Sequence, residues 1–313
     1  MIEERDDRPH AIGPEPAWSE STYFNFHDPS SGLAGFTRIG QRPNEGTADA
    51  NLFLFLPGGG AVAVLERQTQ PDVTEAARVG GVSHEPSKEL ESWRVRCSSK
   101  GLGVAQASQL DVAAEAPRSV TAVDARLEYT ACMPPFGTSG RRKRTQDAAT
   151  AAAAIAAGHF EQACRVRGSV VVGDLSFNVD GLGVRDRSWG PRDWTVPWGW
   201  RWFSMPFAED FAIGVHSVMF PGREVQAGWV WRDGRTIKMQ GFTLDTTYEG
   251  AIHRALRIEA KDVEDRTYAI SGEVGPVIPL QIGTTRVHEG LTTFTLDDGR
   301  TAVGLAEYLD NAR

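Results

Sequence analysis

The stretch from Ala212 to Leu244 reads AIGVHSVMFPGREVQAGWVWRDGRTIKMQGFTL, and it decides the fold class. Its three short segments of apolar or alternating residues are separated by Pro-Gly at 221–222 and Asp-Gly at 233–234. Short amphipathic segments divided by turn dipeptides are typical of an all-β sandwich or barrel. We therefore predict strands over 212–220, 226–232 and 236–244.

The same pattern continues over most of the chain. Residues 50–56 (ANLFLFL) end at a Pro-Gly-Gly-Gly turn and are followed by 61–68, which predicts a β-hairpin. Residues 146–157 depart from the pattern because they are nearly all alanine, which favours one short connecting helix. Further strands are expected at 92–98, 120–130, 169–172, 175–179 and 292–296.

A chain of 313 residues is long enough for two domains of ordinary size. Strand-rich blocks of similar length flank the alanine-rich segment. We therefore place the boundary there and predict two β domains, over residues 1–158 and 159–313.

The composition of the chain limits the kinds of molecule that we expect the protein to bind. A hydrophobic content of 41% and a charged content of 24% are those of a soluble globular protein. The net charge of −8 argues against nucleic acid and anionic membranes as partners. No apolar run has membrane-spanning length, and the acidic N-terminus lacks an apolar signal core. We expect a cytoplasmic protein whose isolated cysteines, Cys97, Cys132 and Cys164, are reduced.

Neither a metal nor a cofactor is expected from the motifs. The seven histidines lack HxH or HExxH spacing, and the cysteines form no CxxC. The glycines at 58–60 follow a strand but lack the second half of a phosphate-binding loop, so a hairpin turn explains them.

The segment from Gly181 to Trp202 contains five of the nine tryptophans together with several arginines and aspartates. Aromatic walls with a few convergent polar groups form ligand sites, although the same residues could plug a barrel. We expect Arg185, Asp186 and Arg192 to form a charge-assisted network. The expected ligand-binding residues are Arg185, Trp189, Arg192, Trp198, Trp200 and Trp202.

Alternation places the last three of these tryptophans on one face of a strand. We predict that at least one of them lines the main cavity. His216, on a neighbouring strand, is expected to face the same space.

Four stretches carry a family resemblance: WSESTYFNFHDP (18–29), GFTRIGQRPNEG (35–46), GLGVRDRSWGPRD (181–193) and GLAEY (304–308). They resemble the signatures of a large bacterial family that is similar to the carotenoid 1,2-hydratases (hydroxyneurosporene synthases). That family is also similar to the lipocalin-like fungal Diels–Alderases and kievitone hydratases. The resemblance spans nearly the whole chain and implies two consecutive calycin- or lipocalin-like β-barrels or sandwiches that hold a hydrophobic ligand.

One position departs from the family pattern, which has histidine where this chain has Arg187. Histidine can transfer a proton near pH 7, whereas arginine stays protonated and cannot act as a base. Either this chain has lost the proton transfer or uses another residue for it, or the position has a structural role.

The candidate catalytic residues follow from the chemistry of water addition to an alkene, which requires a strong acid in a dry pocket. Asp186 is the first choice, although its arginine neighbours favour an ionised, structural carboxylate. Glu307 and Tyr308 lie on an expected strand, 303–309, where alternation turns them to opposite faces; an outward Glu307 with an inward Tyr308 is the structural alternative.

Two histidines complete the catalytic candidates. His216 shares a face with apolar residues, so it is expected to point inward, as an acid–base group or as a core residue. His27 precedes Asp28-Pro29 and is either a general base or part of a turn.

The sequence therefore predicts a cofactor-independent lyase, hydratase or isomerase that acts on a terpenoid, steroid-like or aromatic molecule. A carrier without enzymatic activity and a pericyclase that only shapes its substrate are the alternatives. The oligomeric state stays open, with a homodimer among the options.

Overall fold

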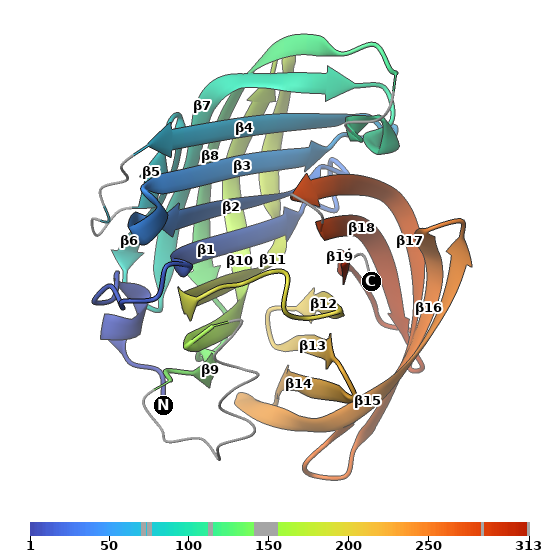
Figure 1. The fold of residues 1–313 in the computed structure, drawn as a ribbon. Coiled ribbons are helices and arrows are strands. Elements are labelled where there is room, and N and C mark those ends of the chain that lie inside the picture. Colours follow the sequence, from blue (N-terminus) through green and yellow to red (C-terminus); the bar gives the residue numbers. More distant parts are fainter. Residues whose placement is uncertain (70–72, 74–76, 112–114, 141–155, 283–284, 312–313) are drawn as a thin grey trace. The chain divides into compact units, whose positions relative to one another are not determined.

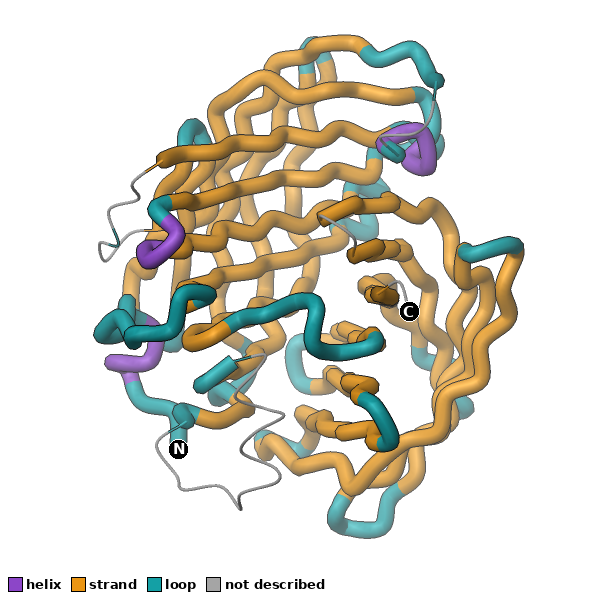
Figure 2. The backbone as a smooth tube through the Cα atoms, in the orientation of Figure 1, coloured by secondary structure: helices purple, strands orange, loops and turns teal. Residues whose placement is uncertain are grey.

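The computed structural model describes residues 1–69, 73, 77–111, 115–140, 156–282 and 285–311. These residues form strands β1 to β19 and three short 3-10 helices, η1 (Glu4–Asp7), η2 (Pro43–Glu45) and η3 (Ala107–Leu110). Strands dominate the trace in Figure 2. The predicted all-β class is therefore confirmed, while residues 146–155 of the expected helix lie outside the described residues.

The chain divides into two compact units. The first comprises residues 1–57, 62–103 and 118–196, and the second comprises 58–61, 104–117 and 197–313. In Figure 1 the part of the second unit from residue 197 onward is coloured yellow to red.

The first unit is built on one antiparallel sheet, in the order β4-β3-β2-β1-β11-β10-β8-β7-β6-β5. A further pairing between β4 and β7 closes a circuit of strands, and β9 pairs with β10. The strands are β1 (Trp18–His27), β2 (Ala34–Arg42), β3 (Thr47–Phe55), β4 (Ala61–Thr69), β5 (Ala77–Val79), β6 (Val82–Lys88), β7 (Ser92–Val104), β8 (Ser119–Ala131), β9 (Phe136–Thr138), β10 (Gly158–Val172) and β11 (Leu175–Pro191).

The second unit contains a closed barrel in which each strand pairs with the next and β12 pairs with β19. At its Asp233-Gly234 turn both residues have positive φ, 53° and 68°, as tight hairpins require. The strands are β12 (Gly199–Ala208), β13 (Phe211–Phe220), β14 (Arg223–Arg232), β15 (Arg235–Glu249), β16 (Ile252–Asp262), β17 (Thr267–Ile282), β18 (Thr285–Leu296) and β19 (Thr301–Asn311).

Each unit has its own hydrophobic core. The core of the first includes Phe24, Leu54 and Val166, and that of the second includes Phe203, Val215 and Phe294. Side chains alternate between the two faces of a strand. The residues that precede and follow a core residue therefore point away from the core.

The strands expected from sequence are found, including the β3–β4 hairpin. The domain boundary differs from the expected one after residue 158. Strands β10 and β11 pair with β8 and β1, so they complete the first sheet, and the division falls between Val196 and Pro197.

Two further observations concern the cellular location that was expected from the sequence. The described part of the chain has no helix that is long and apolar enough to cross a membrane. All three cysteines are free thiols, and Cys97 and Cys164 are buried.

Candidate functional site

Strand β11 carries the arginine–aspartate motif and sends alternate side chains to opposite faces of the first sheet. Arg185 lies over the ring of Phe24, a residue of the core. Asp186 points to the other face, where its carboxylate bonds His159. The motif therefore contributes to two different environments, one inside the first unit and one on the opposite face of its sheet.

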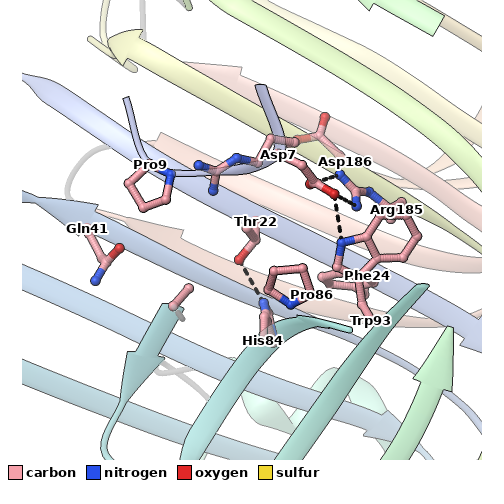
Figure 3. Close-up of a pocket in the computed structure, with 12 residues that line it drawn as sticks. Asp7, Pro9, Thr22, Phe24, Gln41, His84, Pro86, Trp93, Arg185 and Asp186 are labelled. Atoms are coloured by element: carbon pink, nitrogen blue, oxygen red, sulfur yellow. Dashed lines mark hydrogen bonds and ion pairs between the residues drawn. The ribbon is translucent and has the colours of Figure 1, made fainter. Parts of the chain in front are cut away.

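Arg185 is paired with Asp7, from the N-terminal segment, and not with Asp186. Its Nη2 lies 2.5 Å from Asp7 Oδ1 and its Nη1 lies 3.2 Å from Oδ2, as Figure 3 shows. Asp7 also accepts hydrogen bonds from the backbone N–H of Leu90 (2.7 Å) and from Trp93 Nε1 (3.0 Å). Burial alone would raise the pKa of Asp7, but Arg185 and these donors hold it below its usual value. The predicted network is thus wrong for Arg185.

Aromatic rings surround the Arg185 guanidinium. Its carbon Cζ lies 3.7 Å from the ring centre of Trp93 and 4.8 Å from that of Phe160. Cation–π contacts of this kind are strongest where water is excluded, and the Arg185 side chain is only 2% exposed. This arrangement is a buried charge, paired with a carboxylate, that anchors the N-terminal segment.

Arg187 has a similar role. Its Nη2 lies 2.7 Å from Glu20 Oε2 and donates to the carbonyl of Arg8 at 2.8 Å. Glu20 also contacts His10, whose ring stacks on Trp189 with centroids 3.9 Å apart. Arg187 therefore forms a buried ion pair, which favours the structural explanation for this position.

A small polar cavity lies beside these arginines, bordered by Arg185, Arg187, Thr22, His84 and Trp93 (Figure 3). Its volume of about 20 Å³ is room for about one water molecule. A terpenoid or steroid does not fit in such a space. In this region the geometry favours the plug interpretation of the motif over the ligand-site interpretation.

His84 at this cavity is neutral. Burial, followed by the charge of Arg185, lowers its pKa to about 3. The Thr37 hydroxyl donates to the carbonyl of Asn51 (2.6 Å), so it accepts from His84 Nε2 (3.1 Å). Nδ1 then accepts from the Thr22 hydroxyl at 2.7 Å.

On the opposite face of the first sheet, His159 and Asp186 form a hydrogen-bonded pair, and Glu161 Oε1 lies 3.6 Å from His159 Nε2. Burial lowers the pKa of His159, but Asp186 more than offsets this and raises it overall. Sequence reasoning named Asp186 but missed His159 and Glu161. Their spacing on one strand was the available signal, but no strand was predicted there.

The second unit contains a pair of glutamates on adjacent strands. Glu289 of β18 is the direct cross-strand partner of Glu307 of β19. Glu307 is in turn the partner of Trp202, and Trp202 is the partner of His216. These four residues form one row across β18, β19, β12 and β13, on the face of the barrel wall opposite to the hydrophobic core.

The surroundings of Glu289 favour the neutral form of its carboxyl group. Its side chain is buried with 2% exposure, and burial, the charge of Glu307 and a hydrogen bond with Glu307 raise its pKa well above the usual value. Its Oε2 has no hydrogen-bond partner in the described structure. Glu307 accepts a hydrogen bond from the indole N–H of Trp200. The closeness of the two carboxyl groups, beside two tryptophans, therefore favours a proton on Glu289.

The expected opposition of Glu307 and Tyr308 is confirmed. Tyr308 lies in the barrel core, where its ring stacks on His253 at 4.0 Å and its hydroxyl bonds that of Thr246 at 2.7 Å. Burial raises the pKa of Tyr308 to about 12. These contacts make Tyr308 an interior packing residue.

The expectation that His216 points into the barrel is wrong. Ile213 and Val215 supply the core face of β13, so His216 occupies the other face, opposite Trp202. Trp200 and Trp202 share that face, as predicted, whereas Trp198 precedes β12 and is 39% exposed.

Two other predicted residues have local partners. Arg192 donates to the Ser188 hydroxyl, and its guanidinium lies over Trp194. His27 ends β1, and the adjoining Asp28 carboxylate accepts from Ser30 and Ser31 in a turn. The turn explains Asp28, while a catalytic role for His27 stays a prediction.

Comparison with known proteins gives the family. Residues 3–312 match a family described as a domain of unknown function, DUF7064. The chain belongs to this family. No curated protein matches the sequence.

Solved structures of similar fold cover nearly the whole DUF7064 chain. Kievitone hydratase from Nectria haematococca is 12% identical, with a TM-score of 0.64, 100% of this chain covered and 93% of that one. A putative AttH from Nitrosomonas europaea is 13% identical (TM-score 0.63, 96% and 95% covered), and CghA is 12% identical (TM-score 0.53, 95% and 88% covered). At these identities the likeness shows a shared fold.

Proposed function

We propose that this protein binds a hydrophobic small molecule and acts on it as a cofactor-independent lyase, hydratase or isomerase, with Glu289 as the acid and Glu307 as its partner base. The observation that carries the proposal is the pairing of buried Glu289 with half-buried Glu307, beside Trp200 and Trp202. A solvated carboxyl group is ionised near neutral pH and is a poor proton donor, whereas a buried one that shares a proton can donate.

For hydration of an alkene, the steps balance as follows. Glu289 transfers its proton to one alkene carbon, and the positive charge develops on the other. A water molecule adds to that carbon and gives a proton to the Glu307 carboxylate, which leaves an alcohol. The proton then returns to Glu289 across the hydrogen bond between the two side chains. The reverse sequence removes water.

The surroundings of the pair suit this chemistry. The faces of tryptophan rings stabilise a developing cation, and Trp202 lies next to Glu307 in the row. His216, opposite Trp202, is a further acid–base group for this substrate. The fold is shared with kievitone hydratase, whose name records a water-adding or water-removing enzyme. A terpenoid, steroid-like or aromatic alkene is the substrate class that we propose.

A solvent-exchange experiment tests the acid. Purified protein is incubated in D₂O with a panel of apolar alkenes and the corresponding alcohols, after any co-purified ligand has been identified by mass spectrometry. We expect deuterium in the product carbon skeleton for the wild type and its loss in Glu289→Gln. Glu259→Gln removes an exposed carboxylate from strand β16 of the same barrel and should behave as wild type.

Tryptophan fluorescence separates enzyme from carrier. If Glu289→Gln binds ligand as the wild type does but incorporates no deuterium, Glu289 is the acid. If the wild type binds ligand tightly and exchanges nothing with solvent, the protein is a carrier and the proposed chemistry is wrong.

A further inference from the structure

A cluster of nitrogen and oxygen donors lies on the first sheet, apart from the glutamate pair. His159 and Glu161 are two residues apart on β10, so their side chains leave the strand on the same face. Asp186 of β11 is the direct cross-strand partner of Glu161. The strand register therefore brings one imidazole and two carboxylates together from two paired strands.

The distances are those of a compact donor set. One ligand atom from each of the three side chains lies within 4.8 Å of the other two. His159 Nε2 is 3.6 Å from Glu161 Oε1 and is hydrogen-bonded to Asp186 Oδ2. Ligands of a tetrahedral zinc ion, bonded at about 2.1 Å, lie about 3.4 Å from one another, so small side-chain rotations suffice.

The burial of the cluster distinguishes it from an ordinary acidic surface. The Glu161 side chain is 2% exposed and that of Asp186 is 17% exposed. Two carboxylates held together away from water require positive charge nearby, and His159 is adjacent to both. A divalent cation bound between the carboxylates would add positive charge in direct contact with both.

We propose that His159, Glu161 and Asp186 bind a divalent first-row transition-metal ion, such as Zn²⁺. A nitrogen and two oxygen donors suit borderline ions of this class, and three protein ligands leave a coordination position open for water or for an oxygen of a ligand. This site is independent of the function proposed for the glutamate pair.

Two arginines interact with the proposed metal ligands, and their positive charge lowers the affinity of the site for a cation. Arg38 interacts with Asp186, and Arg192 interacts with His159. Each has its own contact as well: Arg38 Nη1 lies 2.9 Å from Asp49 Oδ2, and Arg192 donates to Ser188. We therefore expect an exchangeable ion and not a permanently bound structural one.

The sequence did not predict this metal site because it contains neither HxH nor HExxH spacing. Here two ligands follow an H-x-E pattern on one strand, and the third comes from the next strand. Only the register of β10 and β11 reveals the set.

Tag-free protein, stripped with a chelator, is titrated with Zn²⁺ by calorimetry and with Co²⁺ by visible spectroscopy. We expect one equivalent to bind, with a Co²⁺ spectrum that lacks thiolate charge transfer, since no cysteine belongs to the set. Glu161→Gln and Asp186→Asn should each weaken Zn²⁺ binding by at least about 10-fold, because each removes an anionic ligand. Asp180→Asn, an exposed carboxylate on the same strand β11, should bind as the wild type does.

Two results would overturn the proposal. One is a wild-type protein that takes up no ion in either titration, which needs no variant to interpret. The other is Zn²⁺ binding that survives the combined Glu161→Gln and Asp186→Asn substitutions in folded protein, which would assign the ion to another site.

Discussion

At the scale of single residues, two buried arginines of the first unit each have a carboxylate partner. Arg185 pairs with Asp7, and Arg187 pairs with Glu20, with every one of these side chains at most 5% exposed. Sequence reasoning predicted that Arg185 would be satisfied by a charge but chose Asp186, the adjacent residue. The true partner lies in the N-terminal segment, and no local pattern connects two residues so far apart in sequence.

Removing Asp7 should show how much the stability of the protein depends on the pairing of Arg185 with a carboxylate. Asp7→Ala leaves the Arg185 guanidinium buried without its carboxylate, so we expect a loss of about 3–5 kcal/mol in the free energy of unfolding, measured by urea titration. The double variant Asp7→Leu with Arg185→Met removes both charges and should recover much of the loss. A loss below about 1 kcal/mol in Asp7→Ala would show that the ion pair does not anchor the N-terminal segment.

Glu289 should show the opposite behaviour, because its burial is a cost to the fold at high pH. Its folded pKa is raised, so its contribution to stability is complete below about pH 4.3, the value for an unfolded glutamate, and is lost as pH rises through the folded pKa. Glu289→Gln keeps the shape without the titration. We expect the variant to gain stability relative to wild type as pH rises from 5 to 9, measured by thermal unfolding. A constant difference across this range would mean that Glu289 is not buried as a shared proton donor.

At the scale of elements, alternation along strands explains both what the sequence predicted and what it missed. The turn dipeptides and apolar spacing locate β13, β14 and β15, and alternation separates Glu307 from Tyr308 as expected. Alternation also placed His216 with apolar neighbours, but it does not say which face is the interior. That choice depends on which neighbouring strands close the barrel, and here Ile213 and Val215 supply the core.

The closure of the second barrel gives a prediction at this scale. A Cβ on Gly304 of β19 would lie 1.8 Å from the backbone oxygen of Ser204 on β12, so the paired strands must separate. We expect Gly304→Ala to cost roughly 1–3 kcal/mol or more in the free energy of unfolding. In Gly241→Ala the nearest atom is the side-chain Oε1 of Gln226 at 3.3 Å, so this control should be nearly neutral. Equal stability of the two variants, by thermal unfolding, would contradict the close approach at the seam.

At the scale of the whole molecule, the two units share a fold class but differ in where their buried polar groups lie. In the first, buried charges tie the N-terminal segment to the sheet around a cavity of water size. In the second, the glutamate row lies on the wall and the core is closed by Tyr308 and His253. The motifs predicted the architecture of both units. The division at Val196 required strand pairings between distant segments, which composition alone does not give.

Each unit also buries a neutral histidine, and this makes the molecule sensitive to acid. Burial lowers the pKa of His84 in the first unit to about 3 and that of His253 in the second to about 4. An unfolded histidine takes up a proton near pH 6.5, whereas these two stay neutral while folded. Their contribution to stability is therefore complete above pH 6.5 and is lost as pH falls toward the folded values, by about 1.4 kcal/mol per pH unit for each.

The variant His84→Gln isolates this effect from Glu289, whose stabilisation changes with pH in the opposite direction. A glutamine can accept from Thr22 through its oxygen and donate to Thr37 through its amide, so the hydrogen bonds of His84 have replacements. We expect the variant to be less stable than wild type at pH 7 and to lose less stability between pH 6.5 and 4, as measured by urea unfolding at each pH. Parallel pH profiles for the two proteins would mean that His84 is protonated as easily in the folded chain as in the unfolded one, which its burial between two threonines does not allow.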